Sequence, residues 1–208
     1  MMVPGTIYGV VLNDGLERDR LVTEFGEKPY AAVPQAPVIY IKPNLTVGGS
    51  GSVKVPSGVD SVVVSATIGL LFAADASRVA ANRALDHVGA MCLAIDISLP
   101  QPNYYRPAIR EKTRDGFLPL GAPTLLSLPA SIDTEVDGQQ AHSFELSRLV
   151  RSPAQLISDL SMFMTLRAGD MLLVGLASDA PRSGAGSMVT VRAAGLPELS
   201  TLLVGDRR

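Results

Sequence analysis

Residues 61–72 read SVVVSATIGLLF, and residues 91–97 read MCLAIDI. Both runs are almost continuously apolar. A strand with one face in water would instead alternate between apolar and polar side chains, so continuous apolar runs are typical of strands that are covered on both faces. We therefore expect these two runs to form strands that lie between two layers of the fold.

Further strands are expected on either side of this pair. Fifteen prolines and 19 glycines divide the chain into short apolar segments, which favours a β-rich protein. Asp137 and Gly138 form a hairpin-turn signal between two such segments. The additional strands are predicted at residues 6–12, 37–41, 124–128, 133–137, 171–175, 188–193 and 199–204.

Three segments predict helices. Ser152, Pro153 and Gln155 supply the N-cap, the first-turn proline and the third-position glutamine of a capping box, and apolar residues follow at helical spacing. Residues 77–90 and 16–25 predict two further helices. The order of elements predicts an α+β fold in which strands dominate, organised as one domain over residues 1–208.

The composition restricts the class of protein. Charged side chains make up 18% of the 208 residues, and apolar ones 47%. The charged share is below the usual ~25%, so we expect part of the surface to contact another protein. A disordered chain is excluded. No basic run favours nucleic acid, no apolar run is long enough to span a membrane, and no signal peptide is read.

Generic catalytic motifs are missing. His87, His142 and Cys92 cannot build a closed zinc site. The glycine-rich residues 48–52 and 183–186 lack a nucleophile elbow and the lysine of a phosphate loop. We expect turns at both runs, a polar loop at His142 and an inert core thiol at Cys92. A single cysteine fits a reducing compartment, so a cytoplasmic protein is expected.

Charge is concentrated in residues 96–121, DISLPQPNYYRPAIREKTRDGFLPLG. Asp96 ends an apolar strand, which is a common position for a site residue. Arg106 and Arg110 suit an anionic substrate, because arginine binds a carboxylate through two parallel hydrogen bonds. Lys112 suits enolate stabilisation or proton transfer. A solvated loop with ordinary ion pairs explains the same composition equally well.

This segment resembles the fumarylacetoacetate hydrolase family. The similarity rests on PVIYIKPN at 37–44, YRP at 105–107, KTRDGFLPLG at 112–121 and LSMFMTL at 160–166, in this order. Residues 98–109 are similar to the N-terminal subunit of family members that act as isomerase/decarboxylases in 4-hydroxyphenylacetate degradation. The resemblance implies a mixed β-sheet roll with a few short helices. It also implies decarboxylation and then tautomerisation of an unsaturated oxo-dicarboxylate, with a divalent cation, usually Mg²⁺.

The chain departs from the family pattern at the metal ligands. The Glu-x-Glu pair of catalytic members is replaced by Ser-Ala-Thr at residues 65–67, and Asp96 alone remains as a remnant ligand. One carboxylate does not hold a hard dication that requires several oxygen ligands, so Mg²⁺ is doubtful here. Glu17 and Arg20 replace the histidine and glutamate of an early lid helix. Residues 175–177, Gly-Leu-Ala, replace a Gly-Thr-Pro motif.

Other polar positions match the family. The resemblance implies catalytic roles for Lys112 and Asp115, and substrate-binding roles for Lys42, Arg106 and Arg110. We expect a small keto-acid substrate and a homo- or hetero-oligomer with a homologous, metal-competent subunit. An enzyme active on its own, a family hydrolase acting on a diketo acid, and a non-catalytic assembly or regulatory module are the alternatives.

Overall fold

The computed structural model describes residues 4–30, 32–48, 51–101 and 106–206. Within these residues the strands form sheets of six, five and two strands. The six-stranded sheet has the order β11–β5–β10–β1–β2, and β6 pairs with β5 outside this path. Its strands are β1 (Ile7–Val11), β2 (Val38–Lys42), β5 (Val62–Phe72), β6 (Val88–Ser98), β10 (Met171–Leu173) and β11 (Arg182–Ser183).

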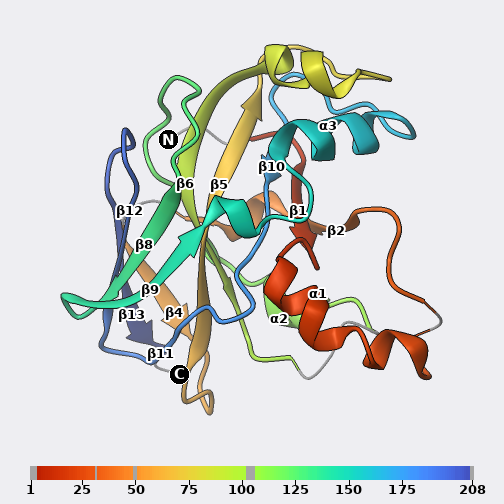
Figure 1. Ribbon diagram of the computed structural model, residues 1–208. Helices are drawn as coiled ribbons and strands as arrows, with labels where there is room; N and C mark the ends of the chain where they lie inside the picture. Colours follow the sequence, from red (N-terminus) through yellow and green to blue (C-terminus); the bar gives the residue numbers. More distant parts are fainter. Residues whose placement is uncertain (1–3, 31, 49–50, 102–105, 207–208) are drawn as a thin grey trace.

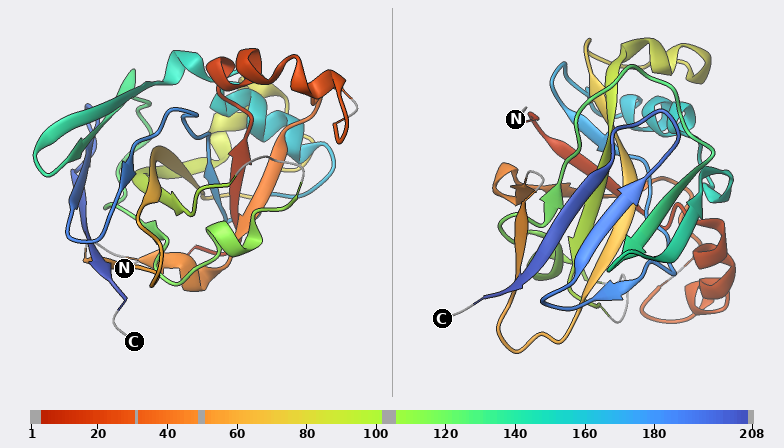
Figure 2. Two further views of the ribbon diagram at one scale, coloured as in Figure 1. Left: turned by 90° about the horizontal axis from the view of Figure 1, so that it is seen from below. Right: turned by 90° about the vertical axis from the view of Figure 1, so that its left-hand side faces the viewer.

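The five-stranded sheet has the order β4–β13–β12–β8–β9. Figures 1 and 2 show it along one side of the long strands β5 and β6, with helices on the other side. Its strands are β4 (Ser52–Val55), β8 (Ser131–Val136), β9 (Gln139–Glu145), β12 (Met188–Arg192) and β13 (Leu199–Gly205). The two-stranded sheet contains β3 (Val47–Gly48) and β7 (Leu118–Pro119).

Strands β5 and β6 lie at the centre of the molecule. They pair antiparallel, from Val63 opposite Ser98 to Phe72 opposite Val88. Most residues of both strands are buried, and their side chains contribute to the largest apolar core. A strand in this position must be apolar on both faces. The expectation from the two continuously apolar runs is therefore confirmed.

Two local signals are confirmed. Helix α3 (Pro153–Ser161) begins after Ser152, whose hydroxyl accepts a hydrogen bond from the backbone N–H of Gln155. Strands β8 and β9 form a hairpin whose turn contains Asp137 and Gly138, at φ values of 53° and 78°. Asparagine, aspartate and glycine tolerate this left-handed region best. Both features depend on neighbouring residues only, so the local sequence identifies them.

The predicted helix over residues 16–25 corresponds to α1 (Gly15–Leu21) and a following 3₁₀ turn. Asp14 is the N-cap of α1, and its side chain accepts a hydrogen bond from the backbone N–H of Leu16. A further short helix, α2 (Ile109–Lys112), was not expected from the sequence. None of the helices in the described part of the chain is both long and apolar enough to cross a membrane. The 3₁₀ helices are η1 (Glu24–Gly26), η2 (Asn44–Thr46), η3 (Ala81–His87) and η4 (Leu146–Arg148).

The helix predicted over residues 77–90 is wrong. Only Ala81–His87 are helical, and they form the 3₁₀ helix η3. Arg78 adopts a positive φ of 53°, which interrupts any regular helix. The chain then becomes extended at Val88, because Val88 pairs with Phe72 at the end of the β5–β6 ladder. Pairing with a distant strand thus outweighs the local helical spacing.

Two other expectations are also wrong. Residues 124–128 form no strand in the structure; Thr124 makes one isolated bridge to Met91, and Leu125 is 82% exposed. His142 does not lie in a loop but in β9, opposite Thr134. The sequence of β9 is mostly polar because most of its side chains are exposed or half-buried. Polarity was therefore a poor guide to backbone conformation at this edge.

Candidate active site

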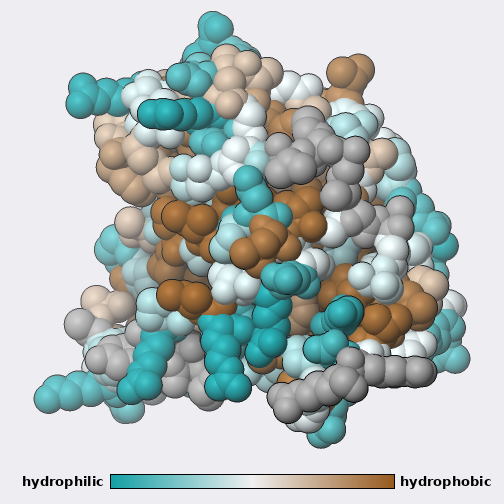
Figure 3. Space-filling view, turned by 180° about the vertical axis from the view of Figure 1, so that it is seen from behind, coloured by the Kyte–Doolittle hydropathy of each residue, from teal (hydrophilic) through white to brown (hydrophobic). Residues whose placement is uncertain are grey.

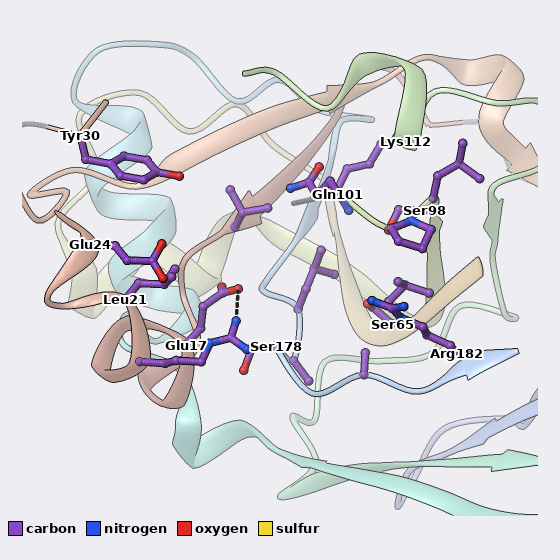
Figure 4. Close-up of a pocket in the computed structure, with 18 residues that line it drawn as sticks. Glu17, Leu21, Glu24, Tyr30, Ser65, Ser98, Gln101, Lys112, Ser178 and Arg182 are labelled. Atoms are coloured by element: carbon purple, nitrogen blue, oxygen red, sulfur yellow. Dashed lines mark ion pairs between the residues drawn. The ribbon is translucent and has the colours of Figure 1, made fainter. Parts of the chain in front are cut away.

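A polar cavity of about 450 Å³ lies between the six-stranded sheet and helix α1. Its floor comes from β5, β6 and β11, and its walls come from α1, α2 and residues 176–180. Figure 4 shows Glu17 and Glu24 on one side of the cavity, and Ser65, Ser98 and Arg182 on the other. Several chain segments that are distant in sequence thus meet around one polar space.

A buried charge cluster forms one end of this cavity. Asp96 is fully buried, and the ammonium nitrogens of Lys42 and Lys112 lie 3.2 and 3.3 Å from its Oδ1 atom. The Tyr40 hydroxyl donates a hydrogen bond to Oδ2. Burial alone would raise the pKa of the Asp96 carboxyl, but the charges of Lys112 and Lys42 and the Tyr40 hydrogen bond hold it below its ordinary value.

Lys42 lies behind Asp96 rather than in the cavity. Its side chain is fully buried, and it also donates to the carbonyl oxygens of Lys112 and Phe117 at 3.0 and 2.8 Å. Burial lowers the pKa of Lys42 to about 8, against the opposing attraction of Asp96. These contacts tie β2 to the segment that carries Lys112. In this structure Lys42 positions the site, and its substrate-binding role stays a prediction.

Lys112 is the member of the cluster that reaches the cavity. Its side chain is 7% exposed and lines the polar space. Its ammonium nitrogen also lies 4.7 Å from the centre of the Tyr40 ring, within the range of a cation–π contact. The formal charges of two lysines and one aspartate sum to one net positive charge. Lys112 presents this charge to any ligand in the cavity.

The residues present do not suit a divalent cation. Both oxygens of Asp96 already accept from lysine or tyrosine donors. Ser65 lies opposite Asp96 on the neighbouring strand, and Thr67 uses its hydroxyl to donate to the carbonyl oxygen of Gly175 at 2.7 Å. No group of three or more His, Cys, Asp or Glu side chains that could hold a metal exists in the described part of the chain. Mg²⁺ prefers several carboxylate or water oxygens, and the described residues of this cavity do not supply such a set.

Helix α1 brings a second pair of charged side chains to the opposite wall. Glu17 is almost fully buried, and its Oε1 atom lies 4.0 Å from Arg20 Nη2 (Figure 4). The structure therefore places both residues that were expected to replace the lid dyad against the cavity. The sequence identified this segment through the family resemblance.

Asp14 fixes this wall. Its fully buried carboxylate accepts two hydrogen bonds from Arg148, and two from the backbone and hydroxyl of Ser178. Burial would raise the pKa of Asp14, but Arg148 and Ser178 hold it below its ordinary value. Asp14 is the N-cap of α1, and Ser178 lines the cavity. The Asp14 carboxylate therefore connects the wall formed by α1 to the wall formed by residues 176–180. Nothing in the local sequence indicated this role.

The remaining predicted residues lie elsewhere. Arg106 is exposed and lines a neighbouring apolar cleft of about 610 Å³, beside Tyr40 and Ile109. Arg110 and Asp115 are exposed and line neither cavity.

Figure 3 shows apolar side chains gathered on the face that carries β2 and α2. Tyr104 and Tyr105, part of the family-like segment, fall outside the described residues.

Several cavity residues were missed by the sequence. Ser178 and Arg182 line the polar space, yet they belong to segments without a recognisable motif, and Ser98 was not singled out within the family-like segment. Arg182 reaches the cavity because β11 pairs with the start of β5. Only this long-range pairing identifies it. The resulting space, polar and flanked by two cationic side chains, suits a small anion and would stabilise negative charge that develops on its oxygens.

Comparison with known proteins gives relatives over nearly the whole chain. The 4-hydroxyphenylacetate degradation bifunctional isomerase/decarboxylase of Escherichia coli is 38% identical over 206 residues, which cover 98% of this chain and 48% of the relative. A homoprotocatechuate catabolism bifunctional isomerase/decarboxylase of Escherichia coli is 37% identical, with the same coverage. The chain therefore spans about half the length of these curated relatives.

Solved structures share the fold. The 5-carboxymethyl-2-hydroxymuconate delta-isomerase from Mycobacterium smegmatis gives a TM-score of 0.83 at 23% identity, over 100% of this chain and 81% of that protein. Fumarylpyruvate hydrolase from Pseudomonas aeruginosa, solved with Mn²⁺ and pyruvate, gives 0.79 at 20% identity, over 98% and 91%. The β-dominant α+β arrangement is thereby confirmed. Residues 6–204 also match the family described as Fumarylacetoacetate (FAA) hydrolase C-terminal. The chain belongs to the fumarylacetoacetate hydrolase family.

Proposed function

We propose that this chain is one half of an isomerase/decarboxylase that acts on unsaturated oxo-di- or tricarboxylates in aromatic catabolism. It works with a homologous subunit that holds the divalent metal. The buried cluster of Lys42, Asp96 and Lys112 carries this proposal, because it presents a positive charge to a polar cavity and leaves Asp96 no free oxygen for a cation. The names of the relatives, and the half-length match to them, support the reaction class.

Lys112 has the central chemical role in this proposal. Loss of carbon dioxide from a β-oxo acid, or proton transfer beside a carbonyl group, leaves negative charge on an enolate oxygen. An ammonium group in a site shielded from water stabilises that charge strongly. Asp96 holds the ammonium in place, and Lys42 holds the backbone of Lys112 by donating to its carbonyl oxygen. Arg106, Arg110 and Asp115 lie outside the polar cavity, so catalytic or binding roles for them require contact with the partner subunit or the substrate's outer end.

The test uses the chain alone and the chain co-purified with its homologous subunit. Metal content by elemental analysis and turnover of the pathway diacid are measured for both. We expect little magnesium in the chain alone, and turnover by the complex that falls at least tenfold in Lys112→Met. Stoichiometric magnesium bound tightly by the chain alone would contradict the proposal.

A non-catalytic assembly module is the second candidate. The presence of Ser65 and Thr67 where catalytic members carry glutamates favours it. Under this alternative, Lys112→Met leaves the turnover of the complex unchanged while assembly persists. Size-exclusion chromatography of the same samples shows whether the complex is intact, so the two candidates give different results.

Cellular location, domain organisation and assembly belong to the same proposal. We place the protein in the cytoplasm, as one domain, in a homo- or hetero-oligomer. The single cysteine, Cys92, is buried and unpaired, which suits a reducing compartment. The apolar face that carries β2 and α2 would suit a partner, since Ile41 and Ile109 are 56% and 66% exposed.

A further inference from the structure

We infer that Arg182 binds a second carboxylate, so that the polar cavity selects dicarboxylates over monocarboxylates. Lys112 would bind one end of the ligand and Arg182 the other. This inference rests on the proposed function, because it assumes that the cavity takes an anion at Lys112. It adds a residue and a length requirement to that site.

The strand register places Arg182 on the cavity floor. Arg182 of β11 lies opposite Val63 of β5, and Val63 lies opposite Ser98 of β6. These three residues form one row across neighbouring strands. Two residues further along β5, Ser65 lies opposite Asp96 in a second row. Side chains two residues apart point to the same face of a strand, so both rows face the cavity.

The two rows set the separation between the backbone positions of Arg182 and Asp96. Arg182 and Asp96 lie two strands apart, roughly 10 Å across the sheet, and about 7 Å apart along it. The ammonium of Lys112 lies 3.3 Å from the Asp96 carboxylate, and the long side chain of Arg182 spans part of the remaining interval. A ligand with a few carbon atoms between two carboxylates fits this interval. We expect a single small carboxylate to contact only one of the two cations.

Arg182 is available for a ligand. No carboxylate of the described residues lies within ion-pair distance of its guanidinium. The other arginine of the cavity, Arg20, is paired with Glu17. A guanidinium that lines a polar cavity and has no carboxylate partner among the described residues is suited to bidentate binding of a carboxylate.

The acidic side chains of the cavity would orient such a ligand. Glu17 and Glu24 belong to α1 and η1 and lie on the wall opposite Arg182 (Figure 4). They would repel a carboxylate from that wall and favour its position over the sheet. Ser65 and Ser98 line the floor between the two cations. Their hydroxyls suit the polar groups in the middle of a ligand, such as an oxo or hydroxyl oxygen.

Calorimetric titration of the full chain tests the inference with matched pairs of probes. The dicarboxylates are glutarate and adipate, and the monocarboxylates are butyrate and valerate. We expect Arg182→Gln to weaken dicarboxylate binding about tenfold, through loss of a charge-assisted pair, and to leave monocarboxylate binding unchanged. Arg83→Gln is the control, because Arg83 is an exposed arginine on η3, outside the cavity.

Lys112→Met separates the two proposals. It should weaken both classes of probe if the cavity binds anions at Lys112. Unchanged dicarboxylate binding in Arg182→Gln, together with weakened binding in Lys112→Met, would overturn the role of Arg182 and leave the proposed function standing. Unchanged binding in Lys112→Met, or no binding of any probe by the unmodified chain, would overturn both. Circular dichroism of each variant confirms that it is folded.

Discussion

The ammonium group of Lys42 donates to the carbonyl oxygen of Phe117 at 2.8 Å, across 75 positions of sequence. The same nitrogen contacts Asp96 and the carbonyl oxygen of Lys112. One buried side chain therefore holds the edge strand β2, the end of β6 and the segment after α2 together. This arrangement makes Lys42 a structural requirement of the site.

Lys42→Met should destabilise the protein strongly. It leaves the buried carboxylate of Asp96 with one cation fewer and removes one donor each from the carbonyl oxygens of Lys112 and Phe117. Loss of one partner of a buried ion pair costs about 3–5 kcal/mol in comparable cases. Urea unfolding followed by circular dichroism measures the loss. Lys54→Met is the matched control, because Lys54 is 74% exposed and pairs only with Asp206. Similar unfolding free energies for the two variants would contradict the structural role.

Gly9→Ala should be poorly tolerated. The ring of Tyr40 lies directly against Gly9, so a Cβ atom at this position would collide with it. Overpacking of this kind costs about 1–3 kcal/mol, and it would also displace the Tyr40 hydroxyl from Asp96. Thermal unfolding provides the measurement. Gly26→Ala has open space around the new methyl group and should change the midpoint little; an equal loss in both variants would be the unexpected result.

Thr67→Val tests the hydrogen bond between β5 and the backbone of Gly175. The fully buried hydroxyl donates to the carbonyl oxygen of Gly175, so its removal leaves a buried acceptor unpaired and should cost about 1–3 kcal/mol. Thr67→Ser keeps the hydroxyl and serves as the comparison, although it removes a methyl group. If the serine variant is less stable than the valine variant, packing rather than the hydrogen bond dominates at this position.

Acid should weaken the contact between Asp179 and Arg148. The hydrogen bond from Arg148 lowers the pKa of Asp179 from 3.8 to about 2. A carboxyl whose pKa is depressed on folding stabilises the protein above its unfolded pKa, and this contribution disappears as the pH falls from about 4 to 2. Asp179 is half exposed, so we expect less than about 1 kcal/mol. Urea unfolding of the protein and of Asp179→Asn at pH 5 and pH 2.5 should give a difference that shrinks at the lower pH.

Cys92 should be inert in the folded protein. It is 4% exposed, and burial raises the pKa of its thiol to about 11. Because the thiolate is the reactive form, labelling with a disulfide reagent at pH 8 should be very slow until denaturant is added. Rapid labelling of the folded chain would show that this part of β6 opens readily.

The sequence identified those parts of the fold that depend on neighbouring residues. The N-cap at Ser152 and the turn at Asp137 are local, and the apolar content of β5 and β6 reports directly on burial. The helix predicted at residues 77–90 does not form, because Val88 pairs with Phe72 of β5. The local spacing of apolar residues carries no information about this pairing. Long-range pairing decided the outcome there.

In the candidate site, too, the sequence identified some residues from their local segment, whereas others could be found only from long-range contacts. The family-like motif located Lys112 and Asp96, because both lie in one continuous charged segment. Arg182 reaches the cavity through the β11–β5 register, and Asp14 contacts Arg148 across 134 positions. No spacing rule within the sequence brings these residues together. They could be assigned only after the strands were placed.

The buried cluster of Lys42, Asp96 and Lys112 has a practical consequence. Its positive charge is covalently attached to the chain, so dialysis or a chelator such as EDTA cannot remove it. In an assembly with a metal-dependent subunit, chelation would remove the activity of the metal site, whereas the cavity of this chain would still bind anions. The two sites would therefore respond differently to metal starvation, even though they share one fold.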